Sequence, residues 1–239
     1  MIILSIDSST PVAGVAVLTE EQILGESMLN TKNTHSEKLL VLVDTLLQEL
    51  HLTMAEIDAV AVAQGPGSFT GLRIGMATAK GLAQGGGKKL IAVPTLDALA
   101  HRMSGVSGLI CPILHAKRNE VYTAAYQCSA TGQMERLSSY QAVDPELLLN
   151  ELAQQPEKVC FLGDGVAVYQ KLLQERLGDK MWLAPMDQRL PSAAAIGVLA
   201  LKRALQDDYD DLYGCELIYI RRSEAEIQWE IKHKQKITD

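Results

Sequence analysis

The segment from Gln64 to Leu82 constrains the fold more than any other part of the chain. Its glycine-rich turn, Gly65-Pro66-Gly67-Ser68-Phe69-Thr70-Gly71, lies between an apolar strand predicted over 58–63 and a helix predicted over 71–84. Because glycine has no Cβ, the backbone of such a junction can approach an anion or another stretch of backbone closely. The segment therefore predicts either a phosphate cradle or a close packing contact.

The remainder of the chain alternates between strands and helices, which predicts an α/β fold with two lobes of mixed sheet flanked by helices and a hinge near 100–108. We expect strands over 2–6, 12–18, 22–29, 59–63, 90–93, 110–114, 121–127 and 159–162. We expect the other helices over 36–50, capped by Ser36, from Pro145 through Leu152, over 166–177 and after Pro191-Ser192. We place the first lobe at residues 1–103, completed by 206–230, the second lobe at 104–205, and a flexible tail at 231–239.

Composition narrows the class of protein. Of the 239 residues, 47% are hydrophobic and 21% charged, as in ordinary globular proteins. A net charge of −7 and an aromatic content of 5% disfavour a broad nucleic-acid-binding face. The N-terminus enters a strand at once, without a basic region or a long apolar run, so we expect neither a signal peptide nor a membrane span. The four cysteines are far apart and read as reduced, buried thiols of a cytoplasmic protein: Cys111, Cys128, Cys160 and Cys215.

Several common catalytic patterns are missing from the sequence. The five histidines form no HExxH or HxxxH pair, so we expect no metal site of that kind. There is no GxxxxGK[ST] phosphate loop and no GxSxG nucleophile turn. A nucleophilic Ser68 would need a base from one of the scattered histidines, which are His35, His51, His101, His115 and His233.

Two short turns are candidates for nucleotide contact. Asp7 ends the first strand and is followed by hydroxyl residues, an arrangement that resembles the first phosphate loop of actin-like and sugar-kinase ATPases. The alternative is that these side chains simply cap the turn. Gly163-Asp164-Gly165 would border an adenine pocket in such a fold, although a strand-to-helix turn explains it equally well. The candidate nucleotide-binding residues are Asp7, Ser9, Thr10, Gly163 and Gly165.

A ridge of small residues follows the glycine-rich turn. Gly71, Gly75 and Ala79 recur at i, i+4 and i+8, so another helix can approach closely, either within the chain or from a partner. Mid-helix glycine costs about 0.5–1 kcal/mol relative to alanine, which indicates that Gly75 has a compensating contact.

Six motifs together resemble one family. They are Ile3-Leu4-Ser5-Ile6-Asp7-Ser8-Ser9, the 65–83 block, Val93-Pro94-Thr95-Leu96-Asp97-Ala98-Leu99-Ala100, Asn119-Glu120-Val121-Tyr122, Gly163-Asp164-Gly165 and Tyr219-Ile220-Arg221-Arg222. The chain resembles the TsaB family, formerly YeaZ. The resemblance implies an actin-like ATPase and sugar-kinase (ASKHA-type) fold. It also implies a role in making threonylcarbamoyladenosine beside the anticodon of tRNA.

The resemblance also implies partners. TsaB resembles its catalytic partner TsaD, whose metal-binding histidine pair corresponds here to Thr95 and Leu99, so we expect a non-catalytic paralogue that activates TsaD. It implies a TsaD heterodimer, a ternary complex with TsaE, a competing homodimer and contact with tRNA only through the complex, with no cofactor required and weak ATP or ADP binding left open. The implied partner-binding residues lie on the helices over 36–50 and 71–84, and we expect Gly75→Leu to abolish partner binding while the chain stays folded. These residues are Leu39, Leu42, Val43, Leu46, Gly71, Leu72, Gly75 and Ala79.

The chain departs from the family at His115, where the usual residue is an acid; we expect a hydrogen-bonded histidine between the lobes. Arg221-Arg222 and the basic run over 232–236 form the only basic cluster, read as a solvated tail with a secondary tRNA contact as the alternative. Two other functions stay open: an ATPase or kinase that uses Asp7, and a glycoprotease-like peptidase.

Overall fold

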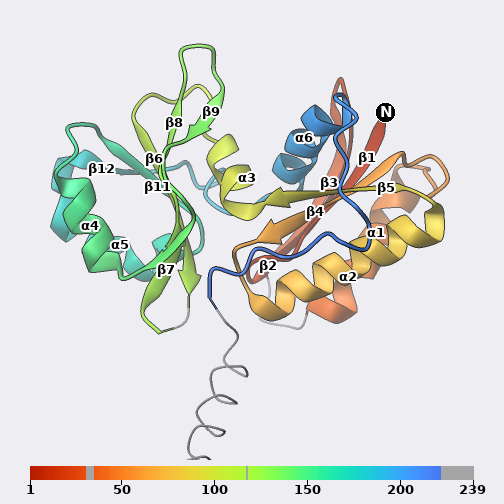
Figure 1. The fold of residues 1–239 in the computed structure, drawn as a ribbon, viewed down its shortest axis with the longest axis horizontal. Coiled ribbons are helices and arrows are strands. Elements are labelled where there is room, and N and C mark those ends of the chain that lie inside the picture. Colours follow the sequence, from red (N-terminus) through yellow and green to blue (C-terminus); the bar gives the residue numbers. More distant parts are fainter. Residues whose placement is uncertain (31–34, 117, 222–239) are drawn as a thin grey trace, which may run out of the picture.

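The protein is described from a computed structural model, over residues 1–30, 35–116 and 118–221 and without the side chains of residues 35–37. Two lobes lie side by side along the long axis of the molecule (Figure 1). The predicted tail at 231–239, the basic run over 232–236, Arg222 and the side chain of Ser36 lie outside the described residues.

The first lobe is built on a five-stranded sheet of order β3-β2-β1-β4-β5. Its strands are β1 (Ile2–Asp7), β2 (Val12–Thr19), β3 (Ile23–Asn30), β4 (Ala59–Gly65) and β5 (Lys89–Pro94). β1, β2 and β3 form an antiparallel meander, whereas β1, β4 and β5 are parallel. The carboxyl ends of these parallel strands therefore meet at one edge of the sheet.

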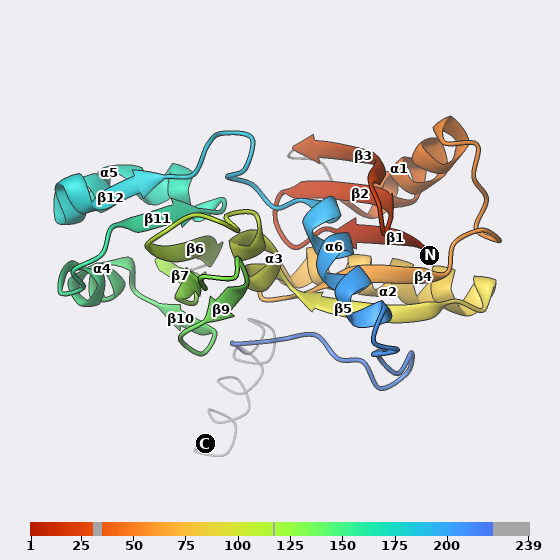
Figure 2. The ribbon, with the colours of Figure 1, turned by 90° about the horizontal axis from the view of Figure 1, so that it is seen from above.

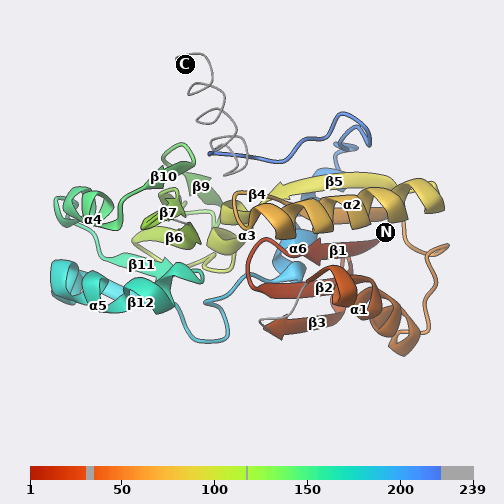
Figure 3. The same cartoon turned by 90° about the horizontal axis from the view of Figure 1, so that it is seen from below.

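Helices cover both faces of this sheet. α1 (His35–Glu49) and α2 (Phe69–Gly86) lie side by side on one face (Figure 3). Their apolar side chains pack on those of β1, β2 and β4 in one core. α2 begins at Ser68, whose hydroxyl accepts a hydrogen bond from the Gly71 amide, and ends at Gly87 in the left-handed conformation.

The opposite face is covered by α6 (Ala193–Ala204), which corrects the predicted lobe boundary (Figure 2). Ile196, Ala200 and Ala204 of this helix pack in the core with apolar residues of β1, β4 and β5. The small alanine side chains allow this close approach. The second lobe therefore ends before residue 193, and its predicted extension to residue 205 is wrong.

The second lobe holds a seven-stranded sheet whose main path is β10-β7-β6-β11-β12, with β8 pairing to β6 and β9. Its strands are β6 (Leu109–Ala116), β7 (Glu120–Thr123), β8 (Tyr126–Cys128), β9 (Met134–Arg136), β10 (Gln141–Val143), β11 (Val159–Leu162) and β12 (Met181–Leu183). α4 (Pro145–Ala153) and α5 (Gly165–Leu177) pack against this sheet, and a 3-10 turn follows over Gly178–Lys180. The strand predicted over 121–127 is broken in two, because β7 pairs with β10 and β8 pairs with β9.

A short helix joins the lobes. α3 (Thr95–His101) follows β5, and the sequence pattern did not predict it. Leu96, Leu99 and Ala100 of α3 pack into a core with Ile110 and Tyr126 of the second lobe. α3 therefore forms a buried joint between the lobes, and only its last two residues fall within the predicted hinge at 100–108. In the described part of the chain, none of the helices has the length and hydropathy needed to cross a membrane.

Candidate functional site

The glycine-rich turn packs directly against the turn between β1 and β2. The Ser68 amide donates to the Ser9 carbonyl over 2.6 Å, and the Ser8 hydroxyl donates to the Gly71 carbonyl over 2.8 Å. A Cβ at Gly67 would overlap the Ser9 carbonyl oxygen, and one at Gly71 would overlap that of Ser8. These glycines are therefore required for backbone-to-backbone packing.

The β1–β2 turn is capped by its own side chains. Asp7 Oδ1 accepts from the Ser9 amide over 2.9 Å and from the Ser9 hydroxyl over 2.7 Å. Thr10 Oγ1 accepts from the Val12 amide over 3.2 Å. No residue from Asp7 to Thr10 is more than 2% exposed. The geometry is thus that of turn capping, and the polar groups named here bond within the chain.

The second candidate turn, between β11 and α5, also packs within its own lobe. Gly163 has φ of +101°, a Cβ there would overlap the Ile113 carbonyl oxygen, and a Cβ at Gly165 would lie 2.9 Å from the same oxygen. Asp164 accepts from the His115 amide over 2.9 Å. Burial raises the pKa of the Asp164 carboxyl, with hydrogen bonding to the His115 amide opposing the shift. The two glycines thus have a structural role against β6.

His115 departs from its predicted place between the lobes. Its side chain is exposed, and its ring lies 6.1 Å from that of Tyr169 on α5 of the same lobe. The bond to the Asp164 carboxylate comes from the backbone amide of His115, not from its ring.

The predicted partner-binding residues are buried inside the first lobe. Leu39, Leu72 and Ala79 are at most 1% exposed. The remaining five, Leu42, Val43, Leu46, Gly71 and Gly75, are also buried. A Cβ at Gly75 would overlap the Ser8 hydroxyl, so the small-residue ridge faces the chain's own β1–β2 turn. Contrary to the sequence-based prediction, we therefore expect Gly75→Leu to disturb the packing of α2 on this turn as well as any partner contact.

The outer surface of the same two helices is formed by different residues. On α1, Leu40 is 53% exposed and Val41 is 61% exposed. On α2, Arg73 and Ala77 are exposed. Two adjacent exposed aliphatic residues interrupt the apolar spacing of α1, and this interruption is the sequence signal that could have marked the outer face.

Comparison with known proteins identifies the family. The family model described as TsaD, tRNA N6-adenosine threonylcarbamoyltransferase, matches residues 22–229. The TsaB protein of Bacillus subtilis, a tRNA threonylcarbamoyladenosine biosynthesis protein, is 32% identical over 229 residues, which cover 96% of this chain and 98% of that protein. The chain belongs to the TsaB family. Its predicted family membership is confirmed.

Solved structures agree with this assignment. YeaZ from Pseudomonas aeruginosa matches this TsaB-family chain with a TM-score of 0.75 and 25% identity, over 91% of this chain and 99% of that one. An activator of 2-hydroxyisocaproyl-CoA dehydratase from Clostridium difficile, solved with ADPNP, matches with a TM-score of 0.51 and 12% identity, over 87% of this chain and 97% of that one. The likeness at this identity shows the fold alone. The fold is the predicted actin-like ATPase and sugar-kinase type.

The other candidate site residues of this TsaB-family chain cap a helix or lie buried in the fold. Ser68 caps α2, with its hydroxyl accepting from the Gly71 amide over 3.3 Å. Thr95 and Leu99, the positions that the family resemblance implies for the TsaD histidine pair, are buried on α3. Among the described residues, no group of three or more histidines, cysteines, aspartates or glutamates is placed to hold a metal ion.

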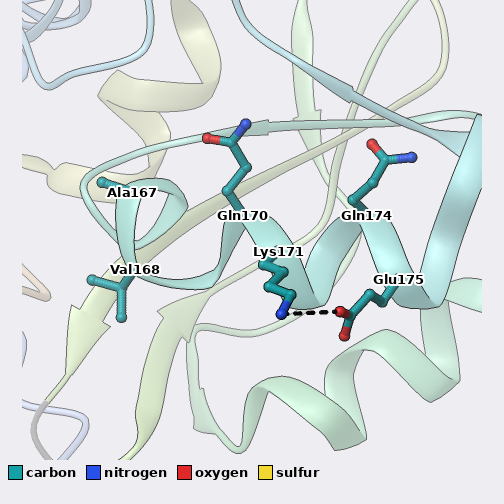
Figure 4. Close-up of a pocket in the computed structure, with 6 residues that line it drawn as sticks. All are labelled: Ala167, Val168, Gln170, Lys171, Gln174 and Glu175. Atoms are coloured by element: carbon teal, nitrogen blue, oxygen red, sulfur yellow. Dashed lines mark ion pairs between the residues drawn. The ribbon is translucent and has the colours of Figure 1, made fainter.

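A surface hollow on the second lobe adds no reactive group. Its lining side chains all come from the outer side of α5 (Figure 4). They are Ala167, Val168, Gln170, Lys171, Gln174 and Glu175, with Lys171 and Glu175 paired across 3.8 Å. The cysteines divide into buried Cys111 and Cys160 and half-buried Cys128 and Cys215, so the expectation of four buried thiols is wrong for the last two.

Proposed function

We propose that this TsaB-family chain is a non-catalytic subunit that binds a TsaD-type enzyme in the cytoplasm and supports its transfer of a threonylcarbamoyl group to tRNA. Its curated relatives are named for threonylcarbamoyladenosine biosynthesis. The observation that carries the proposal is the burial of the β1–β2 turn beneath the N-terminus of α2.

Burial of this turn argues against phosphate chemistry by the chain itself. An ATPase would need the Asp7 carboxylate to reach a metal-bound water and the turn amides to reach phosphate. Here Asp7 is 2% exposed and holds the Ser9 amide and hydroxyl. Breaking these bonds to admit a nucleotide would leave buried donors without acceptors, at about 1–3 kcal/mol each.

The alternative functions lack support in the local geometry. For an ATPase or kinase that uses Asp7, the turn would have to open. For a peptidase, Ser68 would have to leave its capping position at the start of α2. Weak ATP or ADP binding elsewhere on the chain is compatible with the proposed role, which requires no cofactor.

The outer surface of α1 and α2 is the proposed docking surface for the TsaD-type partner. Leu40 and Val41 expose aliphatic side chains on α1, and Ala77 is exposed on α2. Exposed aliphatic side chains that lie together on a surface are typical of a protein interaction site. A second copy of this chain would use the same surface, so a homodimer and a TsaD heterodimer should compete. In this proposal a TsaE-type protein joins the heterodimer, and tRNA is bound only by the complex.

Reconstitution tests the proposal. Threonylcarbamoyladenosine is measured with tRNA, threonine, bicarbonate, ATP and the partner proteins, with and without this chain. We expect omission to remove most product formation. We also expect the double variant Leu40→Glu, Val41→Glu to lose co-purification with the TsaD-type partner.

The matched control is Val168→Glu, which places a glutamate at a 57% exposed aliphatic position on α5 of the other lobe. It should retain full co-purification. Equal product formation without this chain would refute the activator role. Retained binding by the double variant would refute the docking surface.

A further inference from the structure

The chain beyond α6 forms a strap over residues 205–221 that crosses from the first lobe to the second. It contains no helix or extended strand, and none of its residues is fully buried. In Figure 1 it runs past β5 and α2 and ends beside the second lobe. Its apolar residues Leu212, Cys215 and Leu217 are only partly buried against the core of the first lobe, so its attachment also depends on individual polar and aromatic contacts.

The first attachment covers the outer edge of β5. The Asp210 amide donates to the Leu90 carbonyl over 2.9 Å, and the Asp210 carboxylate accepts from the Ala92 amide over 2.7 Å. Arg203 of α6 donates to the same carboxylate oxygen over 3.0 Å. These bonds satisfy an edge that would otherwise be open to pairing with another chain.

The second attachment lies at the start of the glycine-rich turn. The Gln64 side chain donates to the Glu216 carbonyl over 2.8 Å, and the Ile218 amide donates to the Gln64 carbonyl over 2.9 Å. Gly65 has φ of +108°, and a Cβ there would lie 2.8 Å from the Ile218 carbonyl oxygen. The glycine thus lets the strap approach the end of β4.

The third attachment joins two sequence motifs that are far apart in the chain. The rings of Phe69 and Tyr219 lie 5.0 Å apart, and the Arg73 guanidinium lies 3.9 Å from the centre of the Phe69 ring. Arg73 Nε also donates to the Tyr219 hydroxyl over 3.0 Å. Stacking of a cation on aromatic rings at an exposed site is a weak but specific contact.

The strap ends on the other lobe. Arg221 pairs with Glu120 of β7 across 2.6 Å, with side chains 23% and 32% exposed. α3 forms the buried joint between the lobes, whereas this ion pair fastens them through partly exposed groups. A partly exposed ion pair contributes little to stability by itself. The attachment of this end of the strap therefore also depends on the contacts that precede it in the chain.

We propose that residues 205–221 act as a detachable strap, which opens before either lobe unfolds and fixes the arrangement of the lobes while it is attached. Segments with little buried surface open at lower free energy than a packed core. Opening frees the Ala92 amide and the Arg221–Glu120 pair together, because one segment carries both contacts. The proposal is independent of the proposed function.

Amide hydrogen exchange on the full chain tests the strap, with the Ala92 and Ile218 amides as reporters. We expect both to exchange faster than amides of β4, which lies inside the same sheet. Glu120→Gln removes the charge of the ion pair with little change in shape and should speed exchange at Ile218 by about twofold to fivefold. The matched control, Glu146→Gln, removes the charge from a pair with Arg176 inside the second lobe and should leave both reporters unchanged.

A distance measurement tests the effect on the lobes. Spin labels at Thr45→Cys on α1 and Gln174→Cys on α5, with Cys128 and Cys215 replaced by serine, should report a broader distance distribution in Glu120→Gln than with the native Glu120. Tyr219→Ala should give the same broadening while β4 amides keep their protection. Exchange of the strap at the rate of the β4 core would overturn the proposal. So would an unchanged distance distribution in both variants.

Discussion

Substitution of a single glycine in α2 tests the role assigned to the glycine-rich turn. In Gly71→Ala, the added methyl group overlaps the carbonyl oxygen of Ser8. The obstacle is backbone, so it cannot rotate aside as a side chain would. α2 must move away from the β1–β2 turn, which strains the bond from the Ser68 amide to the Ser9 carbonyl and that from the Ser8 hydroxyl to Gly71.

The expected loss of stability is about 3 kcal/mol. Overpacking of a close-packed site costs about 1–3 kcal/mol, and each strained hydrogen bond adds roughly 1 kcal/mol. The gain in helix propensity from alanine offsets about 0.5–1 kcal/mol of this cost. For a chain of this size, the melting temperature should fall by about 6–12 °C.

The matched control is Gly81→Ala in the same helix, where an added Cβ has no atom within 4 Å. This variant should gain about 0.5–1 kcal/mol and melt about 1–4 °C higher. Calorimetry on both variants gives the comparison. Equal melting temperatures for Gly71→Ala and the native chain would refute the packing role of the turn.

Three other groups give direct predictions. Burial raises the pKa of the Cys111 and Cys160 thiols to about 12. A thiol reagent at pH 8 should therefore leave both unmodified in the folded chain, as measured by mass spectrometry. Rapid labelling of the native state would contradict this. Burial also holds the pKa of Asp164 above its ordinary value, so the folded chain binds this proton at higher pH than the unfolded chain does. The stability of the folded state should therefore fall as the pH rises from the ordinary aspartate range through the folded pKa. Asp164→Asn, which keeps an acceptor for the amide of residue 115, should lose this fall in denaturant titrations at pH 4 and 7; an equally steep fall would exclude the carboxyl as its source. Asp97→Ala leaves two tyrosine hydroxyls without their shared acceptor and should cost about 2–3 kcal/mol in urea unfolding, whereas a change below 0.5 kcal/mol would be inconsistent with this contact.

The first half of the chain was largely predictable from local signals. Its strands are apolar runs bounded by turn residues, and the start and end of α2 carry the cap signals of Ser68 and Gly87. α3 escaped prediction because it is short and the residue that precedes it, Pro94, makes no side-chain capping bond.

The errors concern contacts between segments that are distant in the sequence. The spacing of Leu39, Val43 and Leu46 marks the side of α1 that faces the chain's own sheet, and no local pattern separates that face from one that binds a partner. The return of α6 to the first lobe is likewise set by packing across nearly 200 residues of chain, as in the bond of 2.7 Å from the Ser5 hydroxyl to the Ala193 carbonyl. The strap is held by contacts between residues far apart in the sequence, such as Ile218 with Gln64 and Tyr219 with Arg73, which no local pattern reveals.

Asp7→Asn in the reconstituted tRNA modification assay tests the non-catalytic role most directly. Asparagine keeps an oxygen to accept the Ser9 amide and hydroxyl, so the turn should stay capped while the negative charge is lost. The rate of threonylcarbamoyladenosine formation, measured with the variant at a melting temperature close to native, is the readout. A rate within about twofold of the native rate is the predicted result, and a loss of tenfold or more would show that the Asp7 carboxylate takes part in the chemistry.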